Sequence, residues 1–282
     1  MDGILLISKE KGPTSFDTIE QLKRKFKLKK IGHAGTLDPM AEGLLIALVG
    51  KATKLSDYMP DEKVYEIEVL FGKRTNTDDL EGETVEEKPV PDGLEALIKQ
   101  AIPSFTGVIS QVPPAFSAIK KDGKKLYELA RAGVEVKPEP RQVTINSISL
   151  ISVSGNTAKL SVSCMTGTYM RSLARDLGEK AGSCGVLAGL KRTSIGKFSV
   201  NEAQKASEID DIQKALVPVM NALYDLPPVI LNQNMLEKVK NGMQVNHSLR
   251  QISGLCKMVH GNDVVAIGQI FGGVVKVKRG LW

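Results

Sequence analysis

Hydrophobic and polar residues follow two spacings along this chain, and each spacing predicts its own kind of element. Between Val64 and Phe71 hydrophobic residues alternate with polar ones, which is the period of a β-strand. Tyr65, Ile67 and Val69 share one face of this strand, and two glutamates lie on the other. Tyr65 is therefore predicted to point into the protein.

The second spacing places an apolar residue every three or four positions, as on one face of a helix. It appears first between Phe16 and Phe26, directly after Thr14 and Ser15, either of which can cap a helix. Similar patterns predict helices at 91–98, 124–132 and 235–241 and one from Thr166 or Thr168 to about Lys180, and predict strands at 3–7, 141–153, 157–164, 263–267 and 273–277.

Strands and helices in this mixed order predict an α+β fold built on a mixed sheet. A chain of 282 residues exceeds the usual size of one domain. Leu226-Pro227-Pro228 discourages regular structure, because proline fixes the backbone and lacks a donor. We therefore expect a large domain over residues 1–228 and a small β-rich domain over 229–282.

The net charge of +6 changes this picture by favouring a polyanionic partner. Lysine and arginine crowd two stretches, one between Lys23 and Lys30 and one between Lys120 and Lys125. Each stretch is also compatible with an ordinary solvated face.

The number and spacing of the cysteines and histidines argue against a metal site or a disulfide. The three cysteines are odd in number and widely spaced, which favours a reducing compartment, and the three histidines show no ligand spacing. We therefore expect no bound metal. The short apolar run near the N-terminus does not fit a secretory signal, and no run is long enough to span a bilayer, so we expect a soluble cytoplasmic protein without a membrane partner.

The candidate for chemistry is Asp38, in the stretch Gly32-His33-Ala34-Gly35-Thr36-Leu37-Asp38-Pro39 before the apolar run 43–49. Two glycines permit an unusual backbone path, and such a loop can bring a carboxylate to a ligand. Asp followed by Pro is equally typical of a turn or a helix start, where the carboxylate would cap backbone N–H groups. The residue types alone leave both interpretations open.

This stretch resembles the catalytic motif of the TruB-type pseudouridine synthases, and further segments resemble the same family in the same order. Glu10 stands where the family usually has proline in its first motif. The further segments are Lys9-Glu10-Lys11-Gly12-Pro13-Thr14-Ser15, Gly72-Lys73-Arg74-Thr75-Asn76-Thr77-Asp78, Gln111-Val112-Pro113-Pro114-Ala115-Phe116-Ser117-Ala118, Gly167-Thr168-Tyr169-Met170-Arg171-Ser172-Leu173-Ala174-Arg175-Asp176-Leu177-Gly178 and Leu190-Lys191-Arg192-Thr193.

The resemblance implies an enzyme that isomerises uridine to pseudouridine in the T-loop of tRNA (position 55 in tRNA numbering), without a cofactor. It implies that Asp38 is the nucleophile, that Arg171 is the cation paired with it, and that Tyr65 stacks on the uracil and takes part in moving its proton. Arg171 falls in the first turn of its predicted helix, where a positive charge opposes the helix dipole and an acidic partner would offset the cost. An exposed arginine that tolerates a weak penalty is the other interpretation.

The resemblance also implies the residues that bind the substrate. His33 would fill the space that the flipped nucleotide leaves, Tyr169 and Leu190 would line the base pocket, and Lys9 belongs to the same substrate-binding set. The C-terminal residues resemble a PUA domain, a small RNA-binding β-barrel. The expected partner is the T-arm of tRNA, bound by a monomer that needs no guide RNA or obligate protein.

Two other classes of function remain open. An RNA-binding or tRNA-folding module with little or no catalysis would share the basic stretches but would not need Asp38, Tyr65 and Arg171 together. A glycosidase would normally need two carboxylates, and the motifs supply one obvious carboxylate.

Overall fold

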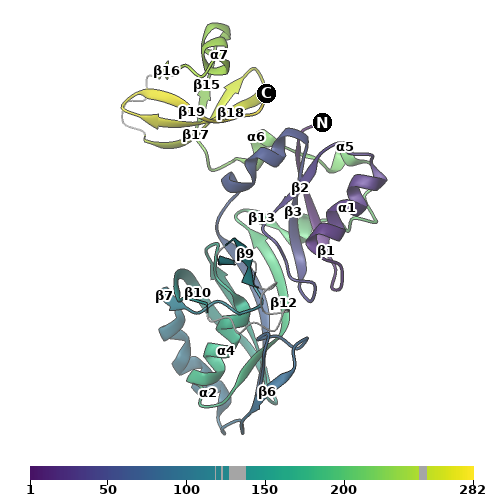
Figure 1. Ribbon diagram of the computed structural model, residues 1–282, viewed down its shortest axis with the longest axis vertical. Coiled ribbons are helices and arrows are strands. Elements are labelled where there is room, and N and C mark those ends of the chain that lie inside the picture. Colours follow the sequence, from purple (N-terminus) through teal and green to yellow (C-terminus); the bar gives the residue numbers. More distant parts are fainter. Residues whose placement is uncertain (118, 122, 127–137, 248–252) are drawn as a thin grey trace. The chain divides into compact units, whose positions relative to one another are not determined.

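The computed structural model describes residues 1–117, 119–121, 123–126, 138–247 and 253–282. The chain divides into two compact units (Figure 1). The first unit contains Met1–Pro39, Leu44–Pro60 and Glu202–Trp282, and the second contains Met40–Gly43 and Asp61–Asn201. No helix of the described residues is long and apolar enough to cross a membrane.

In the first unit, a small sheet carries the N-terminal part of the chain. Its strands β14, β1 and β3 lie in that order, and β2 pairs antiparallel with β3. The elements are β1 (Gly3–Lys9), α1 (Ser15–Lys25), β2 (Ile31–Ala34), β3 (Glu42–Val49), the 3₁₀ helix η1 (Gly50–Tyr58), α5 (Ile212–Ala215), β14 (Val217–Pro218) and α6 (Val219–Ala222).

Helix α1 begins where the sequence predicts, with Thr14 as its cap. The Thr14 hydroxyl accepts a hydrogen bond from Asp17 N at 3.0 Å, and the Asp17 carboxylate accepts one from Thr14 N at 3.0 Å. Ile19 and Leu22 are buried, whereas Phe16 is exposed. The predicted cap and helix are confirmed. Fewer apolar residues of the helix are buried than the apolar pattern indicates.

The end of the chain forms a separate five-stranded sheet in the order β15-β17-β18-β19-β16, with α7 beside it (Figure 1). The elements are β15 (Pro228–Ile230), α7 (Gln233–Lys240), β16 (Val245–Asn246), β17 (Gly254–His260), β18 (Asp263–Phe271) and β19 (Val274–Gly280). Among the described residues, a cluster of buried side chains forms its core and includes Val229, Met258 and Ile270. The helix predicted at 235–241 and the strands predicted at 263–267 and 273–277 are confirmed. The pattern did not predict β17, which pairs antiparallel with β18.

The second unit is built on a mixed sheet, in which the strands β12-β4-β11-β10-β7 lie in that order with antiparallel neighbours. The first two residues of β3, Glu42 and Gly43, belong to this unit and pair parallel with Lys191 and Arg192 of β12. Helix α4 packs on β12 and β4 and also touches α2, which contacts β10. The elements are β4 (Lys63–Phe71), β5 (Lys73–Thr75), β6 (Thr84–Glu87), α2 (Leu94–Ala101), the 3₁₀ helix η2 (Ile102–Phe105), β7 (Gly107–Gln111), β8 (Lys120–Lys121), β9 (Lys124–Lys125), β10 (Arg141–Ser154), β11 (Thr157–Cys164), α4 (Met170–Lys180), β12 (Gly185–Ile195), β13 (Phe198–Ser199) and the 3₁₀ helix η3 (Val200–Glu202), whose last residue belongs to the first unit.

Three predicted helix starts in this unit are wrong. Helix α4 begins at Met170 with Tyr169 as its cap, because the Thr168 hydroxyl donates to Met165 O at 2.9 Å and closes a turn there. Helix α2 begins only after Gly93, whose φ of 72° is a conformation that suits glycine.

The helix predicted over 124–132 does not start at its first residue either. Lys124 and Lys125 form β9, which pairs antiparallel with β8, so the first two residues of the predicted helix belong to a strand. Residues 127–132 lie outside the described part of the chain.

Candidate active site

Asp38 lies in a loop of the first unit that joins two strands. His33 and Ala34 belong to β2, so the loop itself starts at Gly35, and Asp38 is followed by a turn and then β3. Because a strand follows, the interpretation of Asp38 and Pro39 as a helix start is wrong, whereas the turn interpretation holds. Asp38 is half-buried, as is His33 on the neighbouring strand.

The N-terminal motif holds the main chain on both sides of Asp38. Lys9 is only 2% exposed, and its ammonium donates to Asp38 O and Pro39 O, each at 3.3 Å. Gly12 N also donates to Pro39 O, at 2.9 Å. Hydrogen bonds from a buried ammonium are among the stronger ones in proteins, so Lys9 fixes the backbone of this loop. Its place among the substrate-binding residues stays a prediction.

Ser15 adds a second attachment at the residue before Asp38. Its hydroxyl donates to Leu37 O at 3.0 Å and accepts from Leu37 N at 2.9 Å. Both main-chain polar groups of Leu37 are thus bonded to one buried side chain. The first motif of the sequence therefore supports the Asp38 loop.

In the second unit, the structure brings Tyr65 and Leu190 together. Tyr65 on β4 pairs with Arg192 on β12, and Ile67 pairs with Leu190 two residues along. Residues opposite one another in an antiparallel pair share a face, so Tyr65 and Leu190 are diagonal neighbours on one face of the sheet. The prediction that Tyr65 points inward fits its half-buried position beside buried Ile67.

Arg192 is buried on the same face, and the sequence analysis gave it no role. The pKa of Lys63 is lowered by burial and by the nearby charge of Arg192. A buried cation next to Tyr65 is a candidate functional group, and the motif at 190–193 was the signal for it.

Arg171 lies in the first turn of α4, as predicted, and its side chain is buried. Its Nη1 lies 3.5 Å from the Asp79 carboxylate and donates to Thr77 O at 3.3 Å. Its Nη2 donates to Phe116 O at 3.0 Å. The exposed-arginine interpretation is therefore wrong, because burial of the guanidinium is compensated by an acidic partner and two carbonyls. A pairing of Arg171 with Asp38 stays a prediction.

Of the two acidic residues at this place, Asp78 is the last residue of the motif at 72–78 and Asp79 follows it directly. Asp79 Oδ1 accepts from the Thr77 hydroxyl at 2.6 Å and from Glu81 N at 3.1 Å, so its orientation is fixed. Asp78 lies 2.8 Å from the guanidinium of Arg175. Burial raises the pKa of Asp78, and Arg175 opposes that rise. Neither role could be predicted from the sequence, because nothing local connects these acids to α4.

Tyr169 is the cap residue of α4, two positions before Arg171, so the start of one helix carries both. The structure thus groups Lys9 with Asp38 in the first unit, and it groups Tyr65 with Leu190 and Tyr169 with Arg171 in the second. The described residues include no cluster of three or more His, Cys, Asp or Glu side chains that could hold a metal ion.

Comparisons with known proteins show the family of the chain. A model of the TruB family pseudouridylate synthase N-terminal domain matches residues 23–170. The tRNA pseudouridine synthase B of Clostridium kluyveri is 38% identical over 280 residues, which cover 95% of each chain. That of Listeria monocytogenes is 41% identical over 256 residues, which cover 86% of this chain and 84% of the relative.

The chain belongs to the TruB family. The family match contains His33, Asp38, Tyr65 and Tyr169, whereas Lys9, Arg171 and Leu190 lie outside residues 23–170.

Solved structures show the fold. A chain in the crystal structure of a Cbf5-Nop10-Gar1 complex has a TM-score of 0.73 at 22% identity, covering 99% of this chain and 85% of that one. A chain in the structure of an H/ACA RNP bound to a substrate RNA containing 2'-deoxyuridine has a TM-score of 0.72 at 21% identity, with 99% and 85% covered. The predicted α+β class with a small β-rich C-terminal domain is confirmed.

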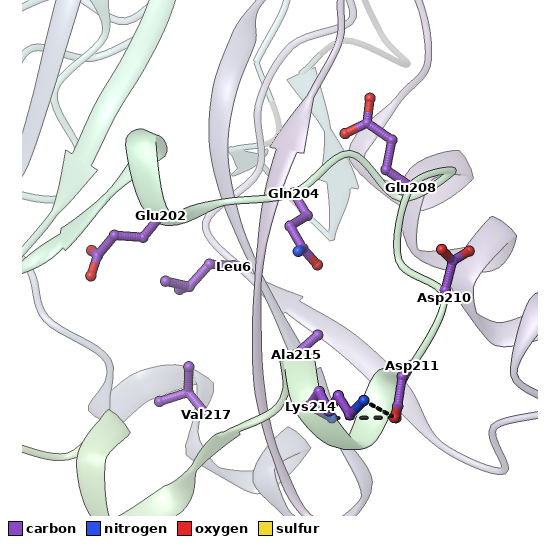
Figure 2. A pocket seen from close by; sticks show the side chains of 9 residues that line it. All are labelled: Leu6, Glu202, Gln204, Glu208, Asp210, Asp211, Lys214, Ala215 and Val217. Carbon is purple, nitrogen blue, oxygen red and sulfur yellow. Dashed lines mark hydrogen bonds and ion pairs between the residues drawn. The ribbon is translucent and has the colours of Figure 1, made fainter.

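A pocket of about 460 Å³ in the first unit contains none of the predicted site residues (Figure 2). Its charged lining is mostly acidic, and Lys214 there lies 3.8 Å from the Asp211 carboxylate. Such a lining repels a phosphate backbone, so this pocket is a poor match for the RNA expected of a TruB-family protein. The lining residues are Leu6, Glu202, Gln204, Glu208, Asp210, Asp211, Lys214, Ala215 and Val217.

Proposed function

We propose that this chain isomerises uridine to pseudouridine in the T-loop of tRNA, with Asp38 as the nucleophile. Membership of the TruB family supports the reaction, and the curated relatives named tRNA pseudouridine synthase B support the substrate. The observation that carries the proposal is the Asp38 loop, whose main chain is fixed by Lys9 and Ser15 on either side of the carboxylate. A carboxylate held in this way suits a group that must meet a reacting atom in one geometry.

The reaction breaks the bond between C1′ and the uracil nitrogen, turns the ring, and forms a bond between C1′ and a ring carbon. The proton on that carbon leaves and a proton is gained at the freed nitrogen, so atoms and electrons balance without a redox partner. Attack by Asp38 would divide this rearrangement into easier steps. No cofactor is needed for such a sequence. Arg171 would favour the ionised carboxylate through its charge.

The base pocket that we propose contains Tyr65, Leu190 and Tyr169. Tyr65 and Leu190 are diagonal neighbours on one face of the sheet, which supports a flat, partly apolar surface for the uracil ring. Tyr65 would stack on the ring and take part in moving its proton. His33 would occupy the place that the flipped base leaves in the RNA, where a flat ring can stack and hydrogen-bond.

The remaining assignments follow from the substrate. We propose that a monomer binds the T-arm of tRNA in the cytoplasm, without a guide RNA or an obligate protein partner. Residues 229–282 would form the RNA-binding domain, and Phe271, which is 79% exposed on β18 next to a strand that carries Lys276 and Lys278, supports contact with RNA bases.

The experiment that tests this proposal maps pseudouridine directly. Purified protein is incubated with an unmodified tRNA transcript, without added metal or cofactor, and pseudouridine is located by carbodiimide-dependent stops of reverse transcription. We expect one stop, at the T-loop uridine. The Asp38→Asn variant should bind the transcript and give no stop, while Asp57→Asn, an exposed aspartate of the same unit, should behave as wild type.

Three outcomes would contradict the proposal. A stop of normal strength with Asp38→Asn would remove Asp38 as the nucleophile. Tight binding of tRNA by the wild type without any stop would instead support the RNA-folding module, and release of free uracil would support a glycosidase.

A further inference from the structure

The motif that begins at Gln111 has no role in the proposed reaction, yet it contacts the start of α4 at several points. We propose that Gln111 is a positioning residue, which holds the start of α4 and thereby places Tyr169 and Arg171. This inference rests on the proposed function, because it assigns Gln111 through residues of that site.

Gln111 is the last residue of β7, and its side chain is 1% exposed. Its Nε2 donates to Tyr169 O at 3.1 Å, and its Oε1 accepts from Tyr169 N at 2.9 Å. One side-chain amide therefore pairs with both main-chain groups of a single residue, as a neighbouring strand would. This pairing fixes the orientation of the amide as well as the peptide units of Tyr169.

Two carbonyls of the same motif continue the attachment along α4. Val112 O accepts from the Ser172 hydroxyl at 2.8 Å and from Arg175 Nη2 at 3.0 Å. Phe116 O accepts from Arg171 Nη2 at 3.0 Å. The motif thus binds α4 at the cap residue, in the first turn and in the turn that follows.

The body of α4 has a separate source of stability. Leu173 and Leu177 are buried in the unit, so apolar packing holds the helix against the sheet. Tyr169 precedes this packed part, and its own side chain makes no cap hydrogen bond. The helix bonds the Tyr169 carbonyl through Leu173 N at 3.1 Å, but the N–H of a cap residue has no partner within its own helix, so the Gln111 amide restrains Tyr169 at a group that the helix does not hold.

Loss of this pairing should displace reacting groups more than it disturbs the fold. A displacement of about 1 Å at a catalytic site is enough to lower the rate by about 100-fold. We therefore expect that removing the amide lowers kcat by about 10- to 100-fold and leaves the affinity for tRNA unchanged.

A Gln111→Glu variant tests this inference, because the pairing with Tyr169 then depends on the protonation of the introduced carboxyl. Protonated glutamic acid matches the amide, since its O–H donates to Tyr169 O while its carbonyl accepts from Tyr169 N. The ionised form instead places an acceptor against Tyr169 O. Burial raises the pKa of such a carboxyl above its usual value of about 4.3, so the protonated form extends toward neutral pH.

We expect the ratio of variant to wild-type kcat to be near one at low pH and to fall as pH rises through that pKa. The ratio is measured under single-turnover conditions between about pH 5 and 8.5, with the Kd for tRNA and the thermal unfolding midpoint recorded at each pH. Gln142→Glu, on the neighbouring strand β10 and exposed, is the matched control and should show a constant ratio.

A constant kcat ratio near one for Gln111→Glu, with the protein folded throughout, would overturn the inference. If the variant unfolds as it ionises, Gln111→Met carries the test, because it fills the space without hydrogen bonds or charge. A lower kcat with unchanged Kd at every pH then supports the inference, and a wild-type kcat overturns it. Failure of the wild type to form pseudouridine would be visible in the same assay and would contradict the proposed function instead.

Discussion

The fold holds Asp38 and Arg171 by different means. Around Asp38, the bonds from Lys9 and Ser15 reach the main chain of residues 37–39. Around Arg171, the contacts involve the guanidinium itself, which faces the Asp79 carboxylate and donates hydrogen bonds to Thr77 O and Phe116 O. One residue is positioned through its backbone and the other through its side chain.

This difference matches the chemistry proposed for each residue. The main-chain bonds at residues 37–39 fix the position from which the Asp38 carboxylate must meet a reacting atom, which suits a nucleophile. A cation that supports a neighbouring charge works best when it is held in advance, since no reorganisation is then needed during the reaction. Substitutions on the two sides should therefore affect stability and rate in different proportions.

The largest effect on stability should come from Arg175→Met, which removes the partner of Asp78 on the Arg171 side. A buried charge left without its partner typically costs about 3–5 kcal/mol, and urea unfolding at pH 7 measures the loss. The double variant Asp78→Leu with Arg175→Met should recover much of it. Equal stabilities of the single and double variants would show that Asp78 bears no uncompensated charge.

The same variant has a predictable pH dependence. Burial already raises the pKa of Asp78 in the folded wild type, and Arg175 opposes the rise, so the substitution should raise it further. A carboxyl with a raised pKa in the folded state stabilises the fold below its unfolded pKa and loses that contribution as pH rises through the folded pKa. The stability gap to wild type should therefore shrink as pH is lowered toward 4.

Asp79→Asn should have the next largest effect, and mainly on the rate. The amide retains one oxygen acceptor but loses the charge that faces Arg171 at 3.5 Å. A hydrogen bond to a charged group contributes about 1.5–3 kcal/mol, so we expect kcat to fall by about 10- to 100-fold with little change in KM. Glu81→Gln, an exposed acid on the same loop, is the control. A wild-type kcat for Asp79→Asn would show that Arg171 does not need this partner.

Ser15→Ala should have a smaller effect, on the Asp38 side. It removes the two bonds to Leu37, and we expect a loss of about 1–3 kcal/mol in stability together with a kcat lowered by about 3- to 30-fold. Ser56→Ala, at an exposed serine of the same unit, should change neither quantity. Loss of stability at an unchanged kcat would mean that Ser15 supports the fold without placing Asp38.

The smallest expected effect concerns the labelling rates of two buried thiols, one in each unit. Burial raises the pKa of Cys164 and of Cys256 to about 11 in both cases. Both should resist iodoacetamide at pH 8 in the folded protein, because the thiolate is the reactive form, and the labelling rate should rise with pH. Mass spectrometry of labelled peptides identifies the thiol that reacts first. Fast labelling of one thiol alone would identify the unit that opens more readily.

Several elements could be predicted because their signals are local. The alternation at 64–71 predicted β4, and Thr14 with the apolar positions after it predicted α1. The apolar spacing around Arg171 predicted that this residue lies in the first turn of a helix. The motif around Asp38 predicted a loop. The start of α4 was misjudged because Thr168 bonds to Met165 instead of capping the helix.

The sequence by itself determined the family, most of the strands and helices, and the residue types that the proposed chemistry needs. Only the tertiary structure decided which groups support them, because those contacts join residues far apart in the chain. Gln111 and Tyr169 are 58 positions apart, and Arg171 and Thr77 are 94. No periodicity or motif spacing encodes a bond of that separation, since it forms only when strands and helices pack and their buried polar groups must find partners.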